Sequence, residues 1–131
     1  RFHGIQVDAD TIPLWEHIVA RANDYGLAYL HLTEPYLPNQ LDGAVAPLAD
    51  VAAHFRPLAR LPIVSNGGFD RARGEAWIAD GHCDAVAYGR AFIANPDLAA
   101  RTAAHLPWAE PDASTFYQGG ASGYTDYPAA P

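Results

Sequence analysis

The sequence has little of what marks a secreted, nucleic-acid-binding or membrane protein. Its single cysteine, Cys83, excludes an internal disulfide framework and favours a cytoplasmic location. Only 8 lysine and arginine residues stand against 15 aspartate and glutamate residues, and the net charge is −7. Nucleic acids and anionic membranes bind basic surfaces, so neither is expected as a partner. No apolar run approaches the roughly 20 residues of a membrane span.

Methionine is also absent, and the chain of 131 residues opens at Arg1, which suggests a piece of a larger protein. The six histidines show no metal-ligand spacing, and Cys83 has no partner motif, so we expect no metal site. His31, in the middle of a predicted strand, is expected to be a core residue rather than a catalytic one.

What is present is the pattern of a globular α/β protein. Half of the residues are hydrophobic and 18% are charged. After a loop at 1–9, apolar residues at helical spacing alternate with short apolar runs typical of buried strands. Helices are predicted at 10–26, 48–57 and 70–80, strands at 27–35, 61–65 and 84–88, and further helix up to an irregular tail at 107–131.

This alternation predicts a parallel sheet with right-handed crossovers. Three parallel strands alone would leave two open edges, which is an aggregation hazard. The simplest solution is that the chain supplies three strands of a larger closed sheet. A complete (β/α)8 barrel needs about 250 residues, so this chain would be part of one.

Two neighbouring strands end in glycine where a helix is expected to begin. The runs are PIVSNGGF (62–69) and DAVAYGRAFIANPDL (84–98). In a β/α barrel, the loops after the last two strands commonly form a phosphate site. Gly67, Gly68 and Gly89 would let main-chain N–H groups approach a ligand, and Arg90 adds a guanidinium suited to phosphate oxygens. Glycine is also common in such turns, but the repeated pattern favours a phosphate site.

Two other features leave their roles open. Glu34 follows a strand end, where barrel active sites lie, but its carboxylate could equally organise the turn before Pro35. Phe116 and Tyr117 form an aromatic pair inside a glycine-rich tail. Such rings can stack on a flat ligand, although packing in the core or anchoring of the tail is the commoner use.

The chain resembles the C-terminal part of the old yellow enzyme family in the runs SNGGFDRARGEAWIADGHCDAVAYGRAFIANPDL (65–98) and STFYQGGASGYTDYP (114–128). The run LAYLHLTEP (27–35) is similar to the sixth strand of that family's barrel. The resemblance implies strands six to eight of a (β/α)8 TIM barrel with flanking helices. Residues 1–131 would then be a partial FMN-binding domain, with the tail at 107–131 contributing to the active site.

The resemblance also implies an activity. Members of the N-ethylmaleimide reductase and xenobiotic reductase type bind FMN non-covalently, reduce it with NADPH or NADH, and transfer hydride to enones, maleimides or nitroalkenes. On the matching positions, Gly67, Gly68, Gly89 and Arg90 would contact the FMN phosphate. Phe116 would lie against the flavin, and Tyr117 would line the pocket of the activated alkene.

Parts of the family pattern do not occur in this chain. The substrate-binding His-Asn or His-His pair, the tyrosine proton donor and the arginine of the RLSP-like motif belong to earlier strands. We therefore assign no catalytic residue here and expect the remaining N-terminal barrel segment as a partner. The alternatives are a non-catalytic half-barrel assembly module, or a phosphate-binding barrel of another class, against which FYQGGASGYTDYP (116–128) speaks.

Overall fold

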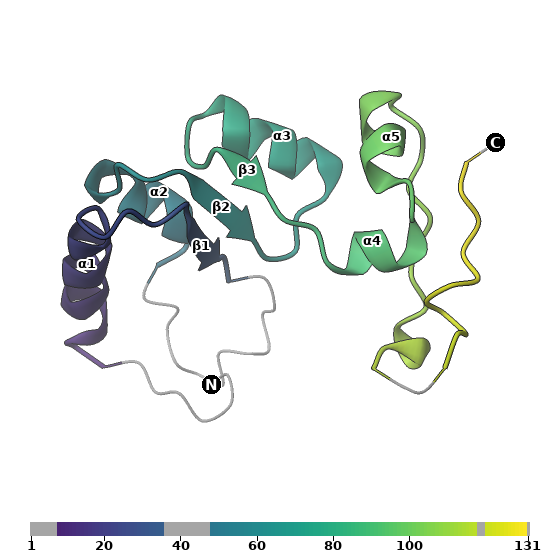
Figure 1. Cartoon of the computed structure of the whole chain (residues 1–131), viewed down its shortest axis with the longest axis horizontal. Coiled ribbons are helices and arrows are strands. Elements are labelled where there is room, and N and C mark those ends of the chain that lie inside the picture. Colours follow the sequence, from purple (N-terminus) through teal and green to yellow (C-terminus); the bar gives the residue numbers. More distant parts are fainter. Residues whose placement is uncertain (1–7, 36–47, 118–119, 131) are drawn as a thin grey trace. The chain divides into compact units, whose positions relative to one another are not determined.

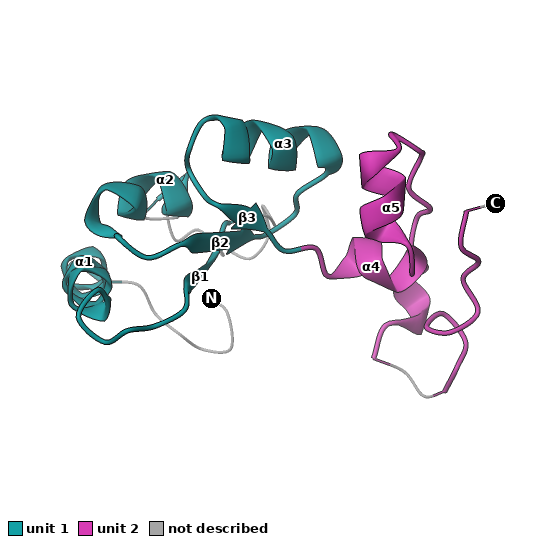
Figure 2. Cartoon of the chain, turned by 45° about the horizontal axis from the view of Figure 1, so that its top comes forward, with its two compact units in different colours: residues 1–87 teal, residues 88–131 magenta. Residues whose placement is uncertain are grey.

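The computed structural model describes residues 8–35, 48–117 and 120–130. The chain divides into two compact units, residues 1–87 (unit 1) and residues 88–131 (unit 2) (Figure 2). Unit 1 contains the sheet and the larger helices. Among its described residues, unit 2 contains short helices and irregular segments but no strand.

The three predicted strands form one parallel sheet in unit 1, in the order β1-β2-β3 (Figure 1). They span Leu30–Thr33 (β1), Ile63–Asn66 (β2) and Ala85–Val86 (β3). The crossovers contain α2 (Val51–Phe55), which continues into a 3-10 turn at Arg56–Leu58, and α3 (Arg71–Ala79). Helix α2 packs against β1 and α3 against β3. The alternating α/β pattern predicted from the sequence is confirmed.

Helix α1 spans Thr11–Ala22 and ends before Gly26, the residue expected to terminate it. The side-chain amide of Asn23 donates to the Ala20 and Leu58 main-chain oxygens, at 3.0 and 2.9 Å, and so closes the last turn early. Gly26, with φ of +62°, still turns the chain toward β1. The helix start is organised by Asp8, whose carboxylate accepts from the Thr11 hydroxyl at 2.8 Å.

The core of unit 1 lies between α1, α2 and the sheet. Its buried members are Val19, Ala52, Phe55, Ala59, Ile63 and Cys83. Strand β1, however, alternates half-buried and exposed side chains, and His31 is exposed. The expectation that His31 is a core residue is wrong for the described structure, because the face of β1 that carries His31 and Thr33 is exposed.

Unit 2 is built from α4 (Arg90–Ala94), α5 (Leu98–Ala103) and a 3-10 turn, η3 (Ala113–Thr115). Among its described residues, the buried side chains are few: Ala94, Asn95 and Leu98. In neither unit do the described residues include a helix long and apolar enough to cross a membrane.

Candidate functional site

The first half of the predicted phosphate cradle follows β2. Gly67 has φ of +123° and Gly68 has φ of +62°, main-chain conformations that residues with a side chain rarely adopt. A Cβ atom at Gly67 would lie 2.5 Å from the main-chain oxygen of Glu34, at the end of the neighbouring strand. The packing of the two strand ends therefore already requires glycine at 67. Its presence is not by itself evidence of a ligand.

Glu34 is buried, with 1% of its surface exposed, and its carboxylate is fully engaged. It accepts hydrogen bonds from the N–H groups of Val51 (2.6 Å) and Ala52 (2.8 Å) and from the Ser65 hydroxyl (3.0 Å). A negative charge at a helix start satisfies N–H groups that have no partner within the helix. Glu34 therefore has an organising role, but it ties β1 to α2 and β2 and does not act on the turn before Pro35 as the sequence suggested.

The start of α3 is also occupied by an acidic side chain. The Asp70 carboxylate accepts from the Arg73 N–H at 2.8 Å, so Asp70 caps the helix that the sequence predicts at 70–80. The Arg73 guanidinium donates to the Gly67 main-chain oxygen at 3.1 Å and lies over the Phe69 ring at 4.4 Å. Because the Asp70 carboxylate already accepts from the Arg73 N–H, this main-chain group at the start of α3 is not free to bind a phosphate.

The second half of the cradle follows β3, in unit 2. It differs from the first in the φ of its glycine, in the space beside that glycine and in the cap of the helix that follows. Gly89 has an ordinary φ of −92° and precedes α4 without a side-chain cap. A Cβ atom at Gly89 would meet no atom within 4 Å. Nothing in the described structure of unit 2 therefore requires glycine here. The exposed Arg90 follows directly and supplies a positive charge rather than a negative one.

The aromatic pair follows η3. Phe116 is half-buried, whereas Tyr117 is 94% exposed, and the two ring centroids lie 6.3 Å apart with the rings nearly perpendicular. Tyr117 also has a φ of +58°, which is uncommon for a residue other than glycine. The alternative that Tyr117 packs in the core is wrong for the described residues, because almost all of its side chain lies in solvent.

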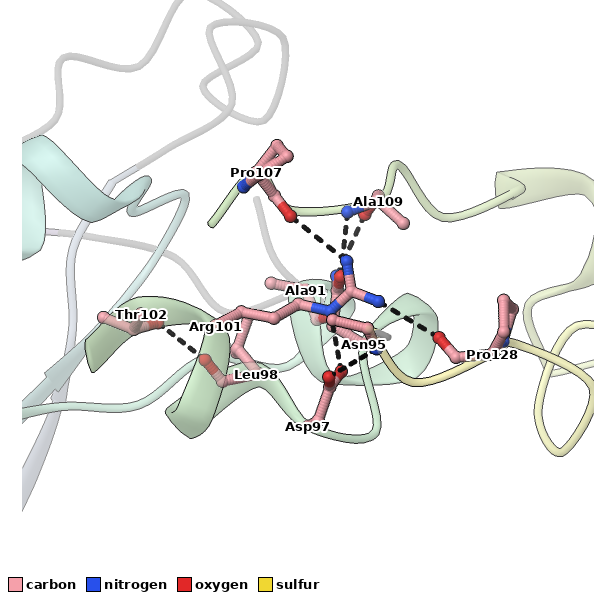
Figure 3. A network of polar contacts seen from close by, with 10 residues as sticks. Ala91, Asn95, Asp97, Leu98, Arg101, Thr102, Pro107, Ala109 and Pro128 are labelled. Atoms are coloured by element: carbon pink, nitrogen blue, oxygen red, sulfur yellow. Dashed lines mark hydrogen bonds and ion pairs between the residues drawn. The ribbon is translucent and has the colours of Figure 1, made fainter. Parts of the chain in front are cut away.

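Asn95 fixes the end of α4 to the start of the tail (Figure 3). Its buried amide donates to the main-chain oxygens of Ala91 (2.8 Å) and Ala109 (3.0 Å). Its side-chain oxygen accepts from the Ala109 N–H at 2.8 Å. In the sequence, the pair Asn95-Pro96 is typical of the start of a helix and indicates no more than a cap. A buried amide that satisfies main-chain groups 14 residues away has no local signal.

Arg101 and Asp97 hold the tail in the same way (Figure 3). The Arg101 guanidinium contacts the Asp97 carboxylate at 2.7 Å and donates to the Pro107 and Pro128 oxygens, each at 3.1 Å. The other Asp97 oxygen accepts from the Ala130 N–H at 2.7 Å. These contacts, the Ala130 N–H first and Arg101 second, hold the pKa of Asp97 below its usual value. The i,i+4 spacing of Asp97 and Arg101 was the available signal for this pair.

Other titratable groups of the described residues have structural roles. Burial, followed by the charge of Asp84, raises the pKa of the Cys83 thiol, so this cysteine is not an activated nucleophile. The Ile63 N–H and then the Arg56 guanidinium lower the pKa of Asp84. Within residues 8–35, 48–117 and 120–130, no group of three His, Cys, Asp or Glu side chains is placed to hold a metal ion.

Known proteins that resemble this chain agree with one another. No family model matches it. The chain is 39% identical over 123 residues to 12-oxophytodienoate reductase 1 of Oryza sativa subsp. japonica, and the match covers 92% of this chain and 32% of that protein. The old yellow enzyme of Trypanosoma cruzi superposes with a TM-score of 0.82 at 35% identity, covering 94% of this chain and 31% of that one. Morphinone reductase in complex with tetrahydroNAD superposes with a TM-score of 0.78 at 34% identity, and the match covers 95% of this chain and 32% of that one.

The chain thus spans about a third of the length of the relatives it matches. Its parallel strands and alternating helices are part of a (β/α) barrel, as in those proteins. The resemblance predicted from the glycine-ended strands and the aromatic tail is confirmed by both comparisons. The chain is a segment of a protein of the old yellow enzyme family.

Proposed function

We propose that the protein containing this chain is an FMN-dependent ene-reductase that uses NADPH or NADH to reduce the C=C bond of activated alkenes such as enones, maleimides and nitroalkenes. The names of its relatives, 12-oxophytodienoate reductase and morphinone reductase, support a reductase. The tetrahydroNAD bound to morphinone reductase supports a nicotinamide as the reductant. The single cysteine, Cys83, favours the cytoplasm as the compartment.

Gly89 and Arg90 carry the proposal that the chain holds the FMN phosphate. The space beside the Gly89 Cα atom is open, and no conformational reason for glycine exists at this position. A close approach of a ligand to the main chain supplies the missing reason. Helix α4 has only five residues, so its dipole contributes little, and the Arg90 guanidinium would supply most of the attraction.

For unit 1, the contact of Gly67 and Gly68 with the FMN phosphate is proposed mainly from the family resemblance. Gly68 has an exposed main chain with φ of +62° and can present its N–H group to a ligand. For Gly67 the proposal depends on the family resemblance alone, since contact with Glu34 already explains the glycine. At the start of α3 the Asp70 carboxylate already occupies the Arg73 N–H. We therefore place the larger contribution on Arg90.

Phe116 and Tyr117 would contact the flavin ring and the alkene. Bound FMN, once reduced by NADPH or NADH, would supply the hydride that adds to the β-carbon of the alkene, and the α-carbon then needs one proton. We assign no proton donor to this chain, so the remaining barrel segment must provide it. Tyr117, 94% exposed in this chain, is the most exposed of the large hydrophobic side chains among the described residues and is thus available to line a substrate pocket.

The surface of unit 1 supports a need for the remaining segment. Apolar side chains of α1 and the residues leading into β1 lie in solvent, with Leu14 at 56%, Trp15 at 50% and Tyr29 at 51% exposure. Strand β1 has a neighbour on one side only in the described sheet. A further strand of the barrel, with its helix, would cover both the edge and these side chains.

The experiment is FMN retention by the full-length protein that contains this chain. We expect a yellow protein that NADPH or NADH bleaches and an enone recolours. Arg90→Ala should raise the FMN dissociation constant about 10- to 100-fold, the value of a charge-assisted contact to phosphate. Arg90→Lys should recover part of this loss. Arg60→Ala, at an arginine of unit 1, serves as the matched control and should leave retention unchanged.

Two results would contradict the proposal in different ways. A full-length protein that never takes up FMN would favour a non-catalytic assembly module. A yellow protein whose retention is the same with Arg90→Ala and Arg60→Ala would leave the flavoprotein in place but overturn Arg90 as its phosphate ligand.

A further inference from the structure

Two tyrosines of the tail bracket the segment that carries the aromatic pair. The Tyr127 hydroxyl accepts a hydrogen bond from the Asp112 N–H at 2.8 Å. The Tyr124 hydroxyl accepts one from the Tyr117 N–H, also at 2.8 Å. The first contact precedes η3 and the second follows it, so residues 112–117 are held at both ends by side chains from 124–127.

The Tyr124 contact falls on the residue that most needs it. Tyr117 has φ of +58°, a conformation that side chains other than those of glycine, asparagine and aspartate seldom adopt. Such a conformation persists only when neighbouring groups hold it. The Tyr117 side chain is 94% exposed, so packing of its own ring does not do so. The hydrogen bond to the Tyr124 hydroxyl acts on the main chain of Tyr117 directly.

A second contact keeps the two segments together between these hydrogen bonds. A Cβ atom at Gly123 would collide with the Thr115 side chain, so the main chain at Gly123 lies directly against η3. The Gly123 N–H donates to the Asp126 carboxylate at 2.8 Å, which fixes the turn that presents Tyr124. The Tyr124 hydroxyl therefore belongs to a turn that is held against η3.

We propose that Tyr124 is a positioning residue that fixes the direction of the Tyr117 ring and so determines how well the enzyme binds its alkene. This inference rests on the proposed function, in which Tyr117 lines the substrate pocket. Tyr124 acts through the main chain of Tyr117. It is not proposed to contact the substrate, the flavin or the transferred hydride.

The test compares Tyr124→Phe with Tyr127→Phe in the full-length flavoprotein. Each variant removes one hydroxyl that accepts from one main-chain N–H in the same tail. Only Tyr124→Phe releases the N–H of Tyr117. The first readout is hydrogen exchange of the Tyr117 amide, which needs neither flavin nor substrate. We expect Tyr124→Phe to speed this exchange roughly two- to tenfold, the effect of losing one such hydrogen bond, and Tyr127→Phe to leave it unchanged.

The second readout separates KM from kcat. Tyr124→Phe should raise the KM for an enone several-fold while the FMN dissociation constant and the KM for NADPH stay the same, and Tyr127→Phe should alter KM less. Unchanged exchange at Tyr117, or an equal KM in the two variants, overturns the inference. A wild-type protein that binds FMN but reduces no alkene instead overturns the proposed function, and with it the assignment of Tyr117 to an alkene.

Discussion

Units 1 and 2 keep their folds by different means. In unit 1, apolar side chains from α1, α2 and the sheet form the core, and the main-chain groups of the strands pair with one another. In unit 2, no strand occurs among residues 88–117 and 120–130. There the side chains of Asn95, Asp97 and Arg101 satisfy main-chain groups of the tail.

The difference follows from what each unit must satisfy. A sheet pairs its own N–H and C=O groups, so its side chains are free to bury apolar surface. An irregular segment has no such ladder, and polar side chains must supply the partners. Unit 2 is the part to which we assign Arg90, Phe116 and Tyr117. Its side-chain contacts give this segment a defined conformation without a regular element.

The largest effect is expected from Gly67→Ala in unit 1. A Cβ atom would meet the Glu34 main-chain oxygen at 2.5 Å, and φ of +123° adds conformational strain. We expect the free energy of unfolding to fall by about 3 kcal/mol, measured by urea denaturation of the full-length protein.

Two glycines serve as controls for this variant. Gly26→Ala, at φ of +62° with no atom within 4 Å, carries the conformational penalty alone and should cost about 1 kcal/mol. Gly89→Ala should cost less still, since its φ is ordinary and its surroundings are open. Equal losses at 67 and 89 would remove the distinction between a glycine required by packing and one left open for a ligand.

A smaller effect is expected from Glu34→Gln. The carboxylate accepts three hydrogen bonds, two of them at the start of α2, and an amide would direct an N–H group at one of these donors. We expect a loss of about 2 kcal/mol in unfolding free energy. Glu16→Gln, at a half-buried carboxylate 2.9 Å from His54, should change it by less than about 1 kcal/mol. If Glu34→Gln abolished turnover at unchanged stability, Glu34 would belong to the active site.

The two units also differ in how far the sequence predicted them. The helices and strands of unit 1 were predictable because apolar periodicity is a local property. The exposure of His31 was not, because it depends on which neighbours cover β1. Gly67 and Gly89 look alike in the sequence, since each ends a strand, and only the position of Glu34 separates them. The candidate site residues could be predicted from the sequence motifs, whereas the side chains that hold the tail in place were found only in the structure.

Those supports were hidden for a physical reason. Asn95 contacts a residue 14 positions away, and Asp97 contacts one 33 positions away. No periodicity links residues at such distances in an irregular segment. A polar side chain at a helix start is usually interpreted as a cap. The Asp70 carboxylate does cap α3, whereas Asp97 precedes α5 without a capping hydrogen bond from its side chain.

The smallest effect is expected from acid on the Asp97 contacts of unit 2. The pKa of Asp97 is lowered in the folded protein, by the Ala130 N–H first and Arg101 second. Its contribution is therefore complete above the unfolded pKa of about 4 and disappears as the pH falls through the lower folded value. Hydrogen exchange of the Ala130 amide should show protection at neutral pH that is lost in this acidic range. In Asp97→Asn the protection should already be reduced at neutral pH and should not change with acid.

Asp84→Asn, which removes a carboxylate of unit 1 whose pKa is also lowered, should leave the exchange of Ala130 unchanged. A loss of protection at Ala130 in Asp84→Asn equal to that in Asp97→Asn would show that the two units respond as one, and the polar contacts of unit 2 would then have no separate role in holding the tail.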